Sequence, residues 1–166
     1  MHCNGGGVAG YPLYWPTMWA PYSYRRDPAC PAFPDDRAIV VFDGVCALCS
    51  RSIQFLLRHD RAGRFRLATA QSLLGTALYT HYGLRTPDYD SFVLIADGTL
   101  WLKSDAVIRV LVELGFPRST LWALKLVPRA FRDALYDLVA RNRFRLFGRR
   151  ATCYVPEPRD RERFLA

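Results

Sequence analysis

The sequence has no apolar run long enough to cross a bilayer. Its longest continuous apolar stretches are only a few residues, such as 92–96, whereas a membrane-spanning helix needs roughly 20. The N-terminus has neither a basic head nor a continuous apolar stretch, so no secretory signal is predicted. These absences lead us to expect a cytoplasmic protein with no transmembrane segment.

Cysteine is sparse, unevenly spread and odd in number: Cys3, Cys30, Cys46, Cys49 and Cys153. This is not the framework of a secreted disulfide-rich domain, and it favours a reducing cytosol. A second Cys-x-x-Cys and a His-x-x-x-His are both missing, so the usual metal-ligand spacings are lacking. We expect neither a metal nor an organic cofactor. The alternative is a zinc site on Cys46, Cys49 and Cys153.

Acidic residues are in deficit, and the net charge is +8. The excess is concentrated late, because residues 125–163 contain 11 Lys or Arg against 5 Asp or Glu. Such a surplus can attract nucleic acid, acidic proteins or anionic lipid. A solvated helix face is the simpler interpretation, and nucleic acid is not an expected partner.

The first 37 residues differ in composition from the rest. They hold 6 of the 11 prolines, a glycine triplet at 5–7 and scattered aromatics. Proline at this density breaks both helix and sheet, so residues 1–37 are predicted to be a disordered or loosely docked tail. Its aromatics could dock on a partner or on the protein's own surface. The ordered domain is predicted to cover 38–166.

Hydrophobic spacing predicts alternating strands and helices from residue 38 onward. Strands are predicted over 39–42, 64–68, 92–96 and 99–102. Helices are predicted over 46–58, 71–82, 104–114, about 121–127 and about 129–143. Asp97-Gly98 is a strong signal for a two-residue hairpin turn. The order is that of an α/β, thioredoxin-like βαβαββα core with extra C-terminal helices.

Some side chains receive more specific structural predictions. Ser104 is expected to cap the helix that follows it. Tyr79 and Trp101 are expected in the core. The last helix is expected to bury an apolar face formed by Phe131, Leu135, Leu138 and Val139.

Cys46 and Cys49 stand three positions apart at the start of a predicted helix, directly after a predicted strand. Unsatisfied N–H groups at a helix N-terminus stabilise a thiolate, which is the reactive species. We therefore predict thiol–disulfide exchange. Cys46 is expected to be the more exposed thiol, with the lower pKa, and to attack the substrate disulfide; Cys49, one turn deeper, resolves the mixed disulfide. The alternative is a pair of packed core cysteines.

Asp43 lies three residues before Cys46. It is predicted to cap the helix, to accept a proton from Cys49 during resolution, or to do both. A carboxylate this close also raises the pKa of a thiol, which opposes the effect of the helix N-terminus.

The basic segment 141–150 interleaves arginines with Phe144 and Phe147 and precedes Cys153. Such a mixture can bind single-stranded nucleic acid. The favoured interpretation is a helix end whose aromatics pack on the domain while the arginines face water. Cys153 is expected to be an isolated cysteine rather than a third redox thiol.

Together these segments resemble the DCC family of thiol–disulfide oxidoreductases over about residues 38–166. The matching stretches are Asp43 to Cys46 with Cys49, then 63–66, 104–106, 136–143, 147–150 and Cys153. The resemblance implies a thioredoxin-like fold and a redox dithiol at Cys46 and Cys49, with Asp43 as the third signature position.

Thioredoxins themselves carry a cis-proline just before the strand that faces the dithiol. Here Asp90-Ser91 precede that strand, and the nearest proline is Pro87. The substrate groove is therefore expected to differ. The predicted function is exchange with a thiol or disulfide substrate, either a protein or a small molecule. The alternative is a binding module whose basic C-terminal helix contacts an acidic partner, nucleic acid or a membrane surface.

Overall fold

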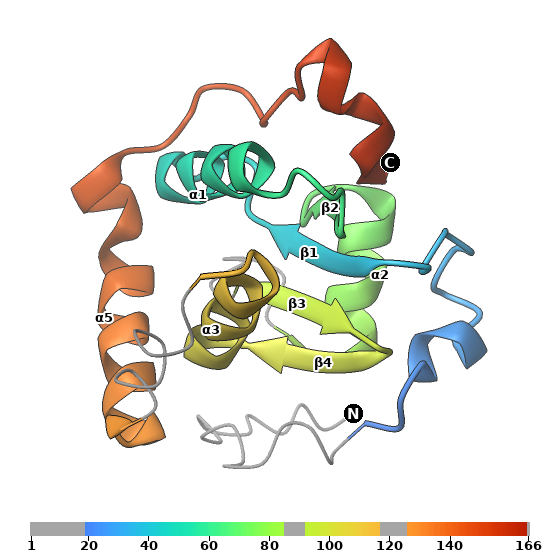
Figure 1. The fold of residues 1–166 in the computed structure, drawn as a ribbon, viewed down its shortest axis with the longest axis horizontal. Helices are drawn as coiled ribbons and strands as arrows, with labels where there is room; N and C mark the ends of the chain where they lie inside the picture. The colour runs from blue at the N-terminus through green and yellow to red at the C-terminus, as the bar shows by residue number, and fades with distance from the viewer. Residues whose placement is uncertain (1–18, 85–91, 117–125, 166) are drawn as a thin grey trace, which may run out of the picture.

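A computed structural model describes residues 19–84, 92–116 and 126–165. A five-stranded mixed sheet forms its centre, with helices on both sides (Figure 1). The main elements are β1 (Ala38–Phe42), α1 (Ala47–His59), β2 (Phe65–Thr69), α2 (Leu73–His81), β3 (Val93–Ala96), β4 (Thr99–Leu102), α3 (Lys103–Glu113), α5 (Arg129–Phe147) and β5 (Phe164–Leu165). The predicted βαβαββα order and a further C-terminal helix are confirmed. The helix predicted over about 121–127 falls mostly outside the described residues.

The sheet has the strand order β4-β3-β1-β2-β5. β1 runs parallel to β2 and antiparallel to β3, and β3 and β4 form an antiparallel hairpin. The hairpin turn is Asp97-Gly98, with φ of 51° and 70°. Two successive positive φ angles match the right-handed twist of the paired strands, as the Asp-Gly dipeptide predicts.

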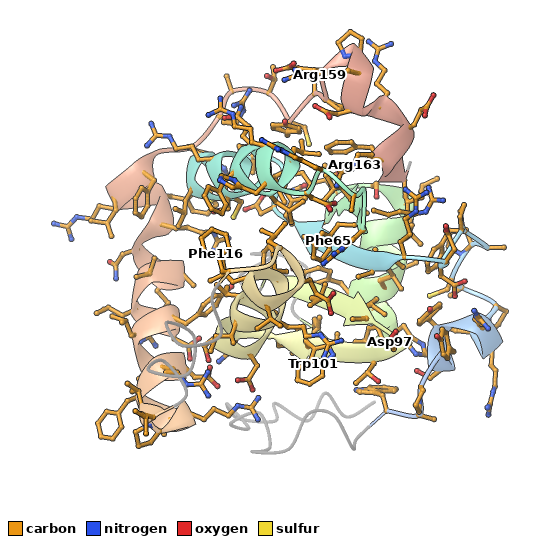
Figure 2. All side chains as sticks on the ribbon, in the orientation of Figure 1. Phe65, Asp97, Trp101, Phe116, Arg159 and Arg163 are labelled. Carbon is orange, nitrogen blue, oxygen red and sulfur yellow. The ribbon has the colours of Figure 1, made fainter. Side chains whose placement is uncertain are left out.

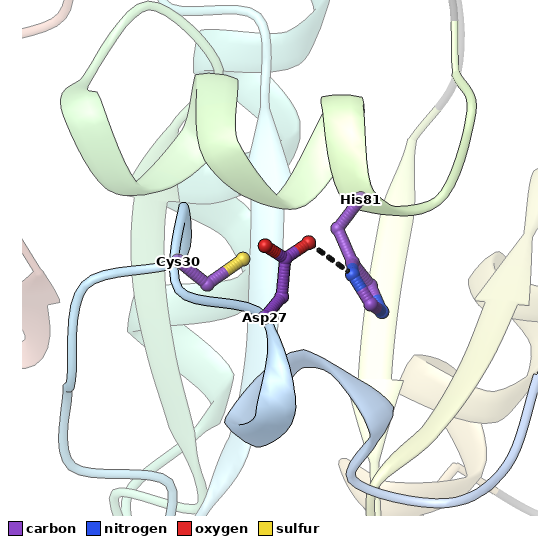
Figure 3. Close-up of side chains that lie close together, drawn as sticks. All are labelled: Asp27, Cys30 and His81. Carbon is purple, nitrogen blue, oxygen red and sulfur yellow. Dashed lines mark hydrogen bonds and ion pairs between the residues drawn. The ribbon is translucent and has the colours of Figure 1, made fainter.

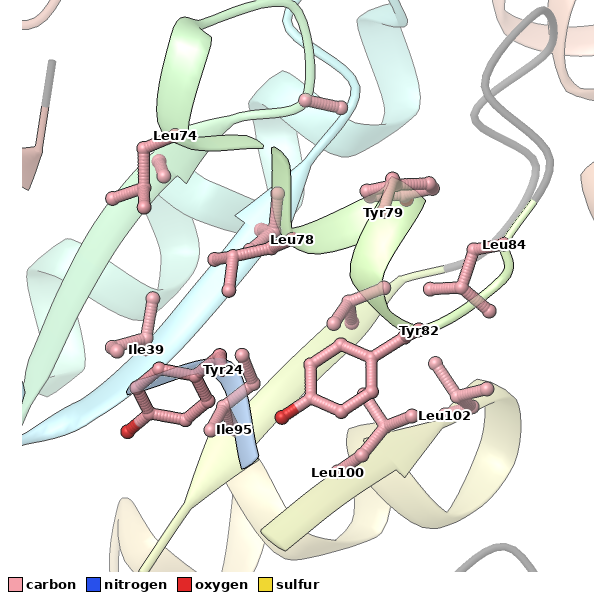
Figure 4. Packing of buried hydrophobic residues seen from close by; sticks show 14 residues of the cluster. Tyr24, Ile39, Leu74, Leu78, Tyr79, Tyr82, Leu84, Ile95, Leu100 and Leu102 are labelled. Atoms are coloured by element: carbon pink, nitrogen blue, oxygen red, sulfur yellow. The ribbon is translucent and has the colours of Figure 1, made fainter. Parts of the chain in front are cut away.

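The central strand β1 is apolar throughout because both of its faces are covered. Ile39 and Val41 join a cluster with α2, whereas Val40 and Phe42 join a cluster with α1 and α3. Figure 4 shows the first cluster, in which Tyr79 is fully buried as expected. Trp101, also expected in the core, is only partly buried. A strand covered on both faces carries an unbroken run of apolar residues rather than an alternating pattern.

Residues 19–37, the described part of the proline-rich stretch, pack onto the α2 side of the sheet. Their short 3-10 helix, η2 (Ser23–Arg26), buries Tyr24 to 3% exposure. Trp19, Tyr22 and Phe33 pack beside it, and the backbone N–H of Tyr22 donates to the carbonyl of Gly98 at 3.0 Å. The aromatics in this part therefore dock on the protein's own surface.

The last described residues form β5, the edge strand of the sheet farthest from β4. A second 3-10 helix, η3 (Pro158–Arg163), leads into β5, which pairs in parallel with β2. Figure 2 shows Arg163 near Phe65, whose carbonyl accepts a hydrogen bond from it. Arg163 also pairs with Asp60, a buried carboxylate that accepts the backbone N–H groups of Arg64 and Phe65 at 3.0 and 3.1 Å. This strand is not predicted from the sequence.

Helix α5 packs through polar groups, which corrects the prediction of a buried apolar face. Phe131, Leu135 and Leu138 are 70%, 63% and 54% exposed, and Val139, the fourth residue of the predicted face, is half-buried. The face of α5 that turns toward the protein instead carries charged residues three to five positions apart. They form ion pairs with residues at the start of α3. These pairs are Arg129–Asp105, Arg132–Asp105 and Lys103–Asp137, with nitrogen–oxygen distances of 2.8 to 3.1 Å.

Ser104 is not the N-cap of α3, because the helix begins one residue earlier, at Lys103, with Leu102 in the capping position. The Ser104 hydroxyl hydrogen-bonds to Asp133 of α5 instead.

Within the described residues, no helix combines the length and the apolar character needed to cross a membrane.

Candidate functional site

The two thiols lie where β1 gives way to α1. Cys46 is the N-cap of α1, with an extended backbone, and its Sγ accepts the backbone N–H of Cys49 at 3.4 Å. The helix begins at Ala47, so Asp43 stands too early in the chain to cap it. The predicted cap is therefore wrong. Asp43 Oδ1 accepts the N–H of Val45 at 3.0 Å and so shapes the loop before the helix.

The pKa values of the two cysteines are shifted in opposite directions. A hydrogen bond from the Cys49 thiol lowers the pKa of Cys46 to about 6, with help from the Cys49 backbone N–H and the positive charge of Arg143, against burial and Asp43. The same thiol–thiol bond, together with burial, raises the pKa of Cys49. The lower pKa of Cys46 has the predicted direction, but its main cause is the partner thiol. The proton therefore resides on Cys49 and the negative charge on Cys46.

The exposures of the two thiols are the reverse of those predicted. Cys46 is fully buried, whereas Cys49 is half-buried. The C-terminal segment 148–154 lies against the loop and the start of α1 through a bridge between Cys46 and Arg149. The N–H groups of Arg150 and Tyr154 also donate to the carbonyls of Val45 and Gly44, at 2.8 and 2.9 Å. This cover comes from about a hundred residues away, so no local pattern around Cys46 could reveal it.

A buried ion pair involves the loop that precedes the two thiols. Arg143 Nη2 contacts Asp43 Oδ2 at 3.3 Å, and the two residues are 5% and 2% exposed. Gln71 completes the group, because its Nε2 donates to Asp43 Oδ1 at 2.7 Å while its Oε1 accepts from Gly44 at 3.0 Å. Buried charges tolerate removal from water only when paired and hydrogen-bonded in this way.

Sequence reasoning missed Arg143 and Gln71 as parts of the site. The arginines of the basic segment were predicted to face water, which holds for Arg141, Arg145, Arg149 and Arg150 but is wrong for Arg143. Its aromatics were predicted to pack on the domain; Phe144 is half-buried, but Phe147 is exposed. The signal available in the sequence was the position of Arg143 within the 136–143 stretch that resembles the DCC family. Gln71 had no such signal.

Cys153 approaches the same loop from the C-terminal segment. It is half-buried, and its Sγ lies 4.0 Å from Gln71 Oε1. The sulfur atoms of Cys46, Cys49 and Cys153 do not all lie within 4.8 Å of one another. The arrangement thus gives no support to the alternative zinc site. His59 and His81, both at helix ends, hydrogen-bond to Phe55 and Asp27 and are not grouped with Cys46, Cys49 or Cys153.

An apolar cavity of about 450 Å³ opens beside Cys49. It lies between α1 and α3, and its lining includes Phe55, Val107, Leu111 and Tyr136. Ligand sites are commonly concave and apolar with a few polar groups. A substrate held here would lie next to Cys49, the half-buried thiol of the pair.

The positions where a cis-proline would stand in thioredoxins are outside the described residues.

Comparison with known proteins identifies the family of the chain. Residues 40–149 match the model of the DCC1-like thiol-disulfide oxidoreductase family. The chain belongs to this family. It is 38% identical over 127 residues to the uncharacterized protein YuxK of Bacillus subtilis, covering 76% of this chain and 93% of the relative.

A second relative is a DCC family protein of Arabidopsis thaliana described as chloroplastic. It is 37% identical over 121 residues, covering 72% of this chain and 70% of the relative. No solved structure matches the chain. As a DCC1-like protein, the chain has a role in redox chemistry with thiols or disulfides as its substrates.

Proposed function

We propose that this DCC1-like protein is a protein-disulfide oxidoreductase that works through Cys46 and Cys49. The observation that carries the proposal is the unequal thiol pair at the start of α1, with the pKa of Cys46 lowered to about 6. A thiol with that pKa is mostly ionised at neutral pH and is ready to attack a disulfide.

In the proposed reaction, the Cys46 thiolate attacks one sulfur of a substrate disulfide. The substrate S–S bond breaks, a mixed disulfide forms on Cys46, and the departing substrate thiolate takes a proton from solvent. Cys49 then loses its proton and attacks the Cys46 sulfur. This step releases the second substrate thiolate, forms the Cys46–Cys49 disulfide and leaves the substrate reduced by two electrons. An external dithiol regenerates the pair. Because Cys46 is buried, segment 148–154 has to move off the loop for the first attack.

Asp43 is the group to which we assign the proton released by Cys49. Its negative charge acts on both thiols, raising the pKa of each. That charge opposes a free Cys49 thiolate, so in the proposed step Asp43 acts as the base that takes the Cys49 proton while the Cys49 sulfur attacks. Arg143 has the opposite effect on both thiols and is a positioning residue for Asp43.

The proposed substrate carries an apolar side chain next to its disulfide. The cavity beside Cys49 is apolar and of about 450 Å³, which is large enough for one or two such side chains. Seating that side chain between α1 and α3 brings the adjacent sulfur to the start of α1. We assign the reaction to the cytoplasm, where the dithiol is kept reduced and acts as a reductant.

Trapping the mixed disulfide tests the assignment of roles. The Cys49→Ser variant should accumulate a mixed disulfide through Cys46 when given a peptide disulfide, whereas Cys46→Ser should not. Intact-mass measurement after acid quenching reads both outcomes. If Cys46→Ser traps the substrate through the half-buried Cys49 instead, the nucleophile is Cys49 and the proposed order is wrong.

A redox titration of the wild type tests the function itself. A reversible two-electron transition between Cys46 and Cys49, at about −120 to −270 mV, is expected from the range of known exchange proteins. Thiol alkylation followed by mass spectrometry reports the fraction oxidised at each potential. If the thiols never pair, or pair only on unfolding, the exchange mechanism is wrong.

The second candidate function is a binding module, which is favoured by the exposed arginines around the end of α5. Arg141, Arg145, Arg149 and Arg150 all face water, and such a group binds anionic partners in a salt-dependent way. Binding of heparin or anionic vesicles that persists in Cys46→Ser, and weakens with added salt, would support this function over exchange.

A further inference from the structure

A second cluster of reactive side chains lies outside the dithiol site. Asp27 follows η2, Cys30 lies three residues later, and His81 is the last residue of α2. Their ligand atoms all lie within 4.8 Å of one another, and all three residues are half-buried (Figure 3). Asp27 and Cys30 precede the residues that match the family model, which begin at 40.

The imidazole of His81 is fixed on both sides. Its Nδ1 lies 2.6 Å from Asp27 Oδ2, and its Nε2 lies 2.9 Å from Ser23 Oγ. The rings of Trp19 and Tyr82 pack on it at centroid distances of 5.2 and 4.8 Å. In the metal-free protein Nδ1–H donates to the Asp27 carboxylate; a bound zinc would displace that proton, with Nε2 still held by Ser23. Metal-ligating histidines are usually oriented by such a hydrogen bond from the other ring nitrogen.

The charges of the cluster also suit a cation. The Asp27 carboxylate accepts the backbone N–H of Ala29 through Oδ1 at 2.9 Å and faces His81 through Oδ2. An Asp27 carboxylate and a Cys30 thiolate this close together would repel each other. A divalent cation between the two removes that repulsion and deprotonates the thiol.

We propose that Asp27, Cys30 and His81 form a zinc site whose fourth position is taken by water. One carboxylate oxygen, one thiolate and one imidazole are a donor set that zinc accepts, whereas magnesium and calcium select oxygen donors. Three protein ligands leave one tetrahedral position open, and the partial exposure of all three residues lets water reach it. The zinc joins residues 27–30 to the end of α2 and so ties the N-terminal segment to the sheet.

The test uses a background in which Cys46 and Cys49 are both serine, so that zinc cannot bind the dithiol. Zinc chloride is titrated into the reduced protein against a chromophoric chelator. One zinc per chain is expected, with a melting temperature that rises on zinc addition. Because the dithiol is absent, the result is independent of the proposed exchange function.

Variants separate ligands from bystanders. Cys30→Ser and Asp27→Asn should each lower the zinc affinity by more than the roughly 10–100-fold that loss of an outer hydrogen bond costs. Ser23→Ala should lower it within that 10–100-fold range, and Cys153→Ser should leave it unchanged. Cobalt in place of zinc should give a sulfur-to-metal absorption band that Cys30→Ser abolishes.

Two results would overturn the proposal. One is the absence of stoichiometric zinc binding by the reduced background protein. The other is binding that survives both Cys30→Ser and Asp27→Asn, which would assign the metal to other groups. Circular dichroism of the metal-free variants identifies any that fail to fold. Asp27→Asn, which keeps the size and shape of the side chain, then decides the outcome.

Discussion

The sulfur of Cys153 occupies the space that a β-carbon on Gly44 would need. Its Sγ lies 2.3 Å from the position of that carbon, far inside normal contact distance. The next residue, Tyr154, donates its N–H to the Gly44 carbonyl at 2.9 Å. The absence of a β-carbon at Gly44 thus leaves room for the close approach of the C-terminal segment.

Gly44→Ala is expected to destabilise the protein by about 1–3 kcal/mol, the usual cost of overpacking a filled site. Adding Cys153→Ala should recover most of that loss because it removes the sulfur. Urea unfolding of the two single variants and the double variant measures both effects. Gly75→Ala is the contrasting control, since its β-carbon would meet the backbone oxygen of Thr69 at 2.1 Å and has no such rescue. A double variant no more stable than Gly44→Ala would show that the clash lies elsewhere.

Arg143→Gln is expected to raise the pKa of Cys46, because the arginine charge lowers it in the wild type. Thiolate absorbance or the rate of alkylation against pH, followed in a Cys49→Ser and a wild-type background, measures the midpoint. The wild type should titrate near pH 6. Arg145→Gln is the matched control, because this exposed arginine lies on the same helix. Equal shifts in the two variants would mean that net charge, rather than the buried contact, sets the pKa.

The stability of the reduced protein should increase from about pH 6 toward pH 9. Cys46 has a pKa of about 6 when folded against an ordinary value of 9.0. In that range the unfolded chain keeps a proton that the folded protein has lost, so stability rises with pH. The contribution is lost as the pH falls through 6. Above pH 9 the raised pKa of Cys49 acts in the opposite direction.

Urea unfolding in excess reductant at intervals from pH 6 to 8.5 checks this dependence. Cys46→Ser should lack the Cys46 contribution to the slope, while Cys153→Ser should retain it. An identical slope in wild type and Cys46→Ser would show that the thiol does not ionise early.

Val107→Asp should weaken turnover of disulfides flanked by apolar residues by about tenfold or more in kcat/KM. The substitution brings a charge into the apolar cavity beside Cys49, where an apolar substrate group cannot hydrate it. The pKa of Cys46 should be little changed, which separates substrate binding from thiol activation. Leu73→Asp is the control, since Leu73 is 86% exposed and does not line the cavity. Equal losses in both variants would argue against the cavity as the substrate site.

The parts of the fold that local sequence determines were predictable. The apolar run of β1, the Asp97-Gly98 turn and the spacing of α1 each report their own surroundings within a few residues. The packing of α5 was not predictable, because Phe131, Leu135 and Leu138 have helical apolar spacing yet are exposed. Its inner face depends on ion pairs with residues of α3, which no periodicity within α5 reveals.

In the candidate site, too, features that depend on neighbouring residues were predictable, whereas features that depend on distant residues were not. The dithiol and the lower pKa of Cys46 follow from the Cys-x-x-Cys spacing at a helix start. The burial of Cys46 and the role of Arg143 depend on residues 140–154 folding back onto the loop. Such long-range contacts are fixed by tertiary packing, so single-sequence reasoning placed Arg143 in water and Cys46 at the surface.

The ion pair between Asp43 and Arg143 spans 100 positions of the chain. During synthesis the dithiol therefore emerges long before the arginine that lowers its pKa and the segment that covers it. A nascent or truncated chain ending before Arg143 lacks the arginine contribution to the Cys46 pKa and the segment that covers Cys46, so this thiol is more accessible to oxidants. The buried ion pair and the cover over Cys46 form only after residues 143–154 have been made, so the environment of Cys46 is assembled late in synthesis.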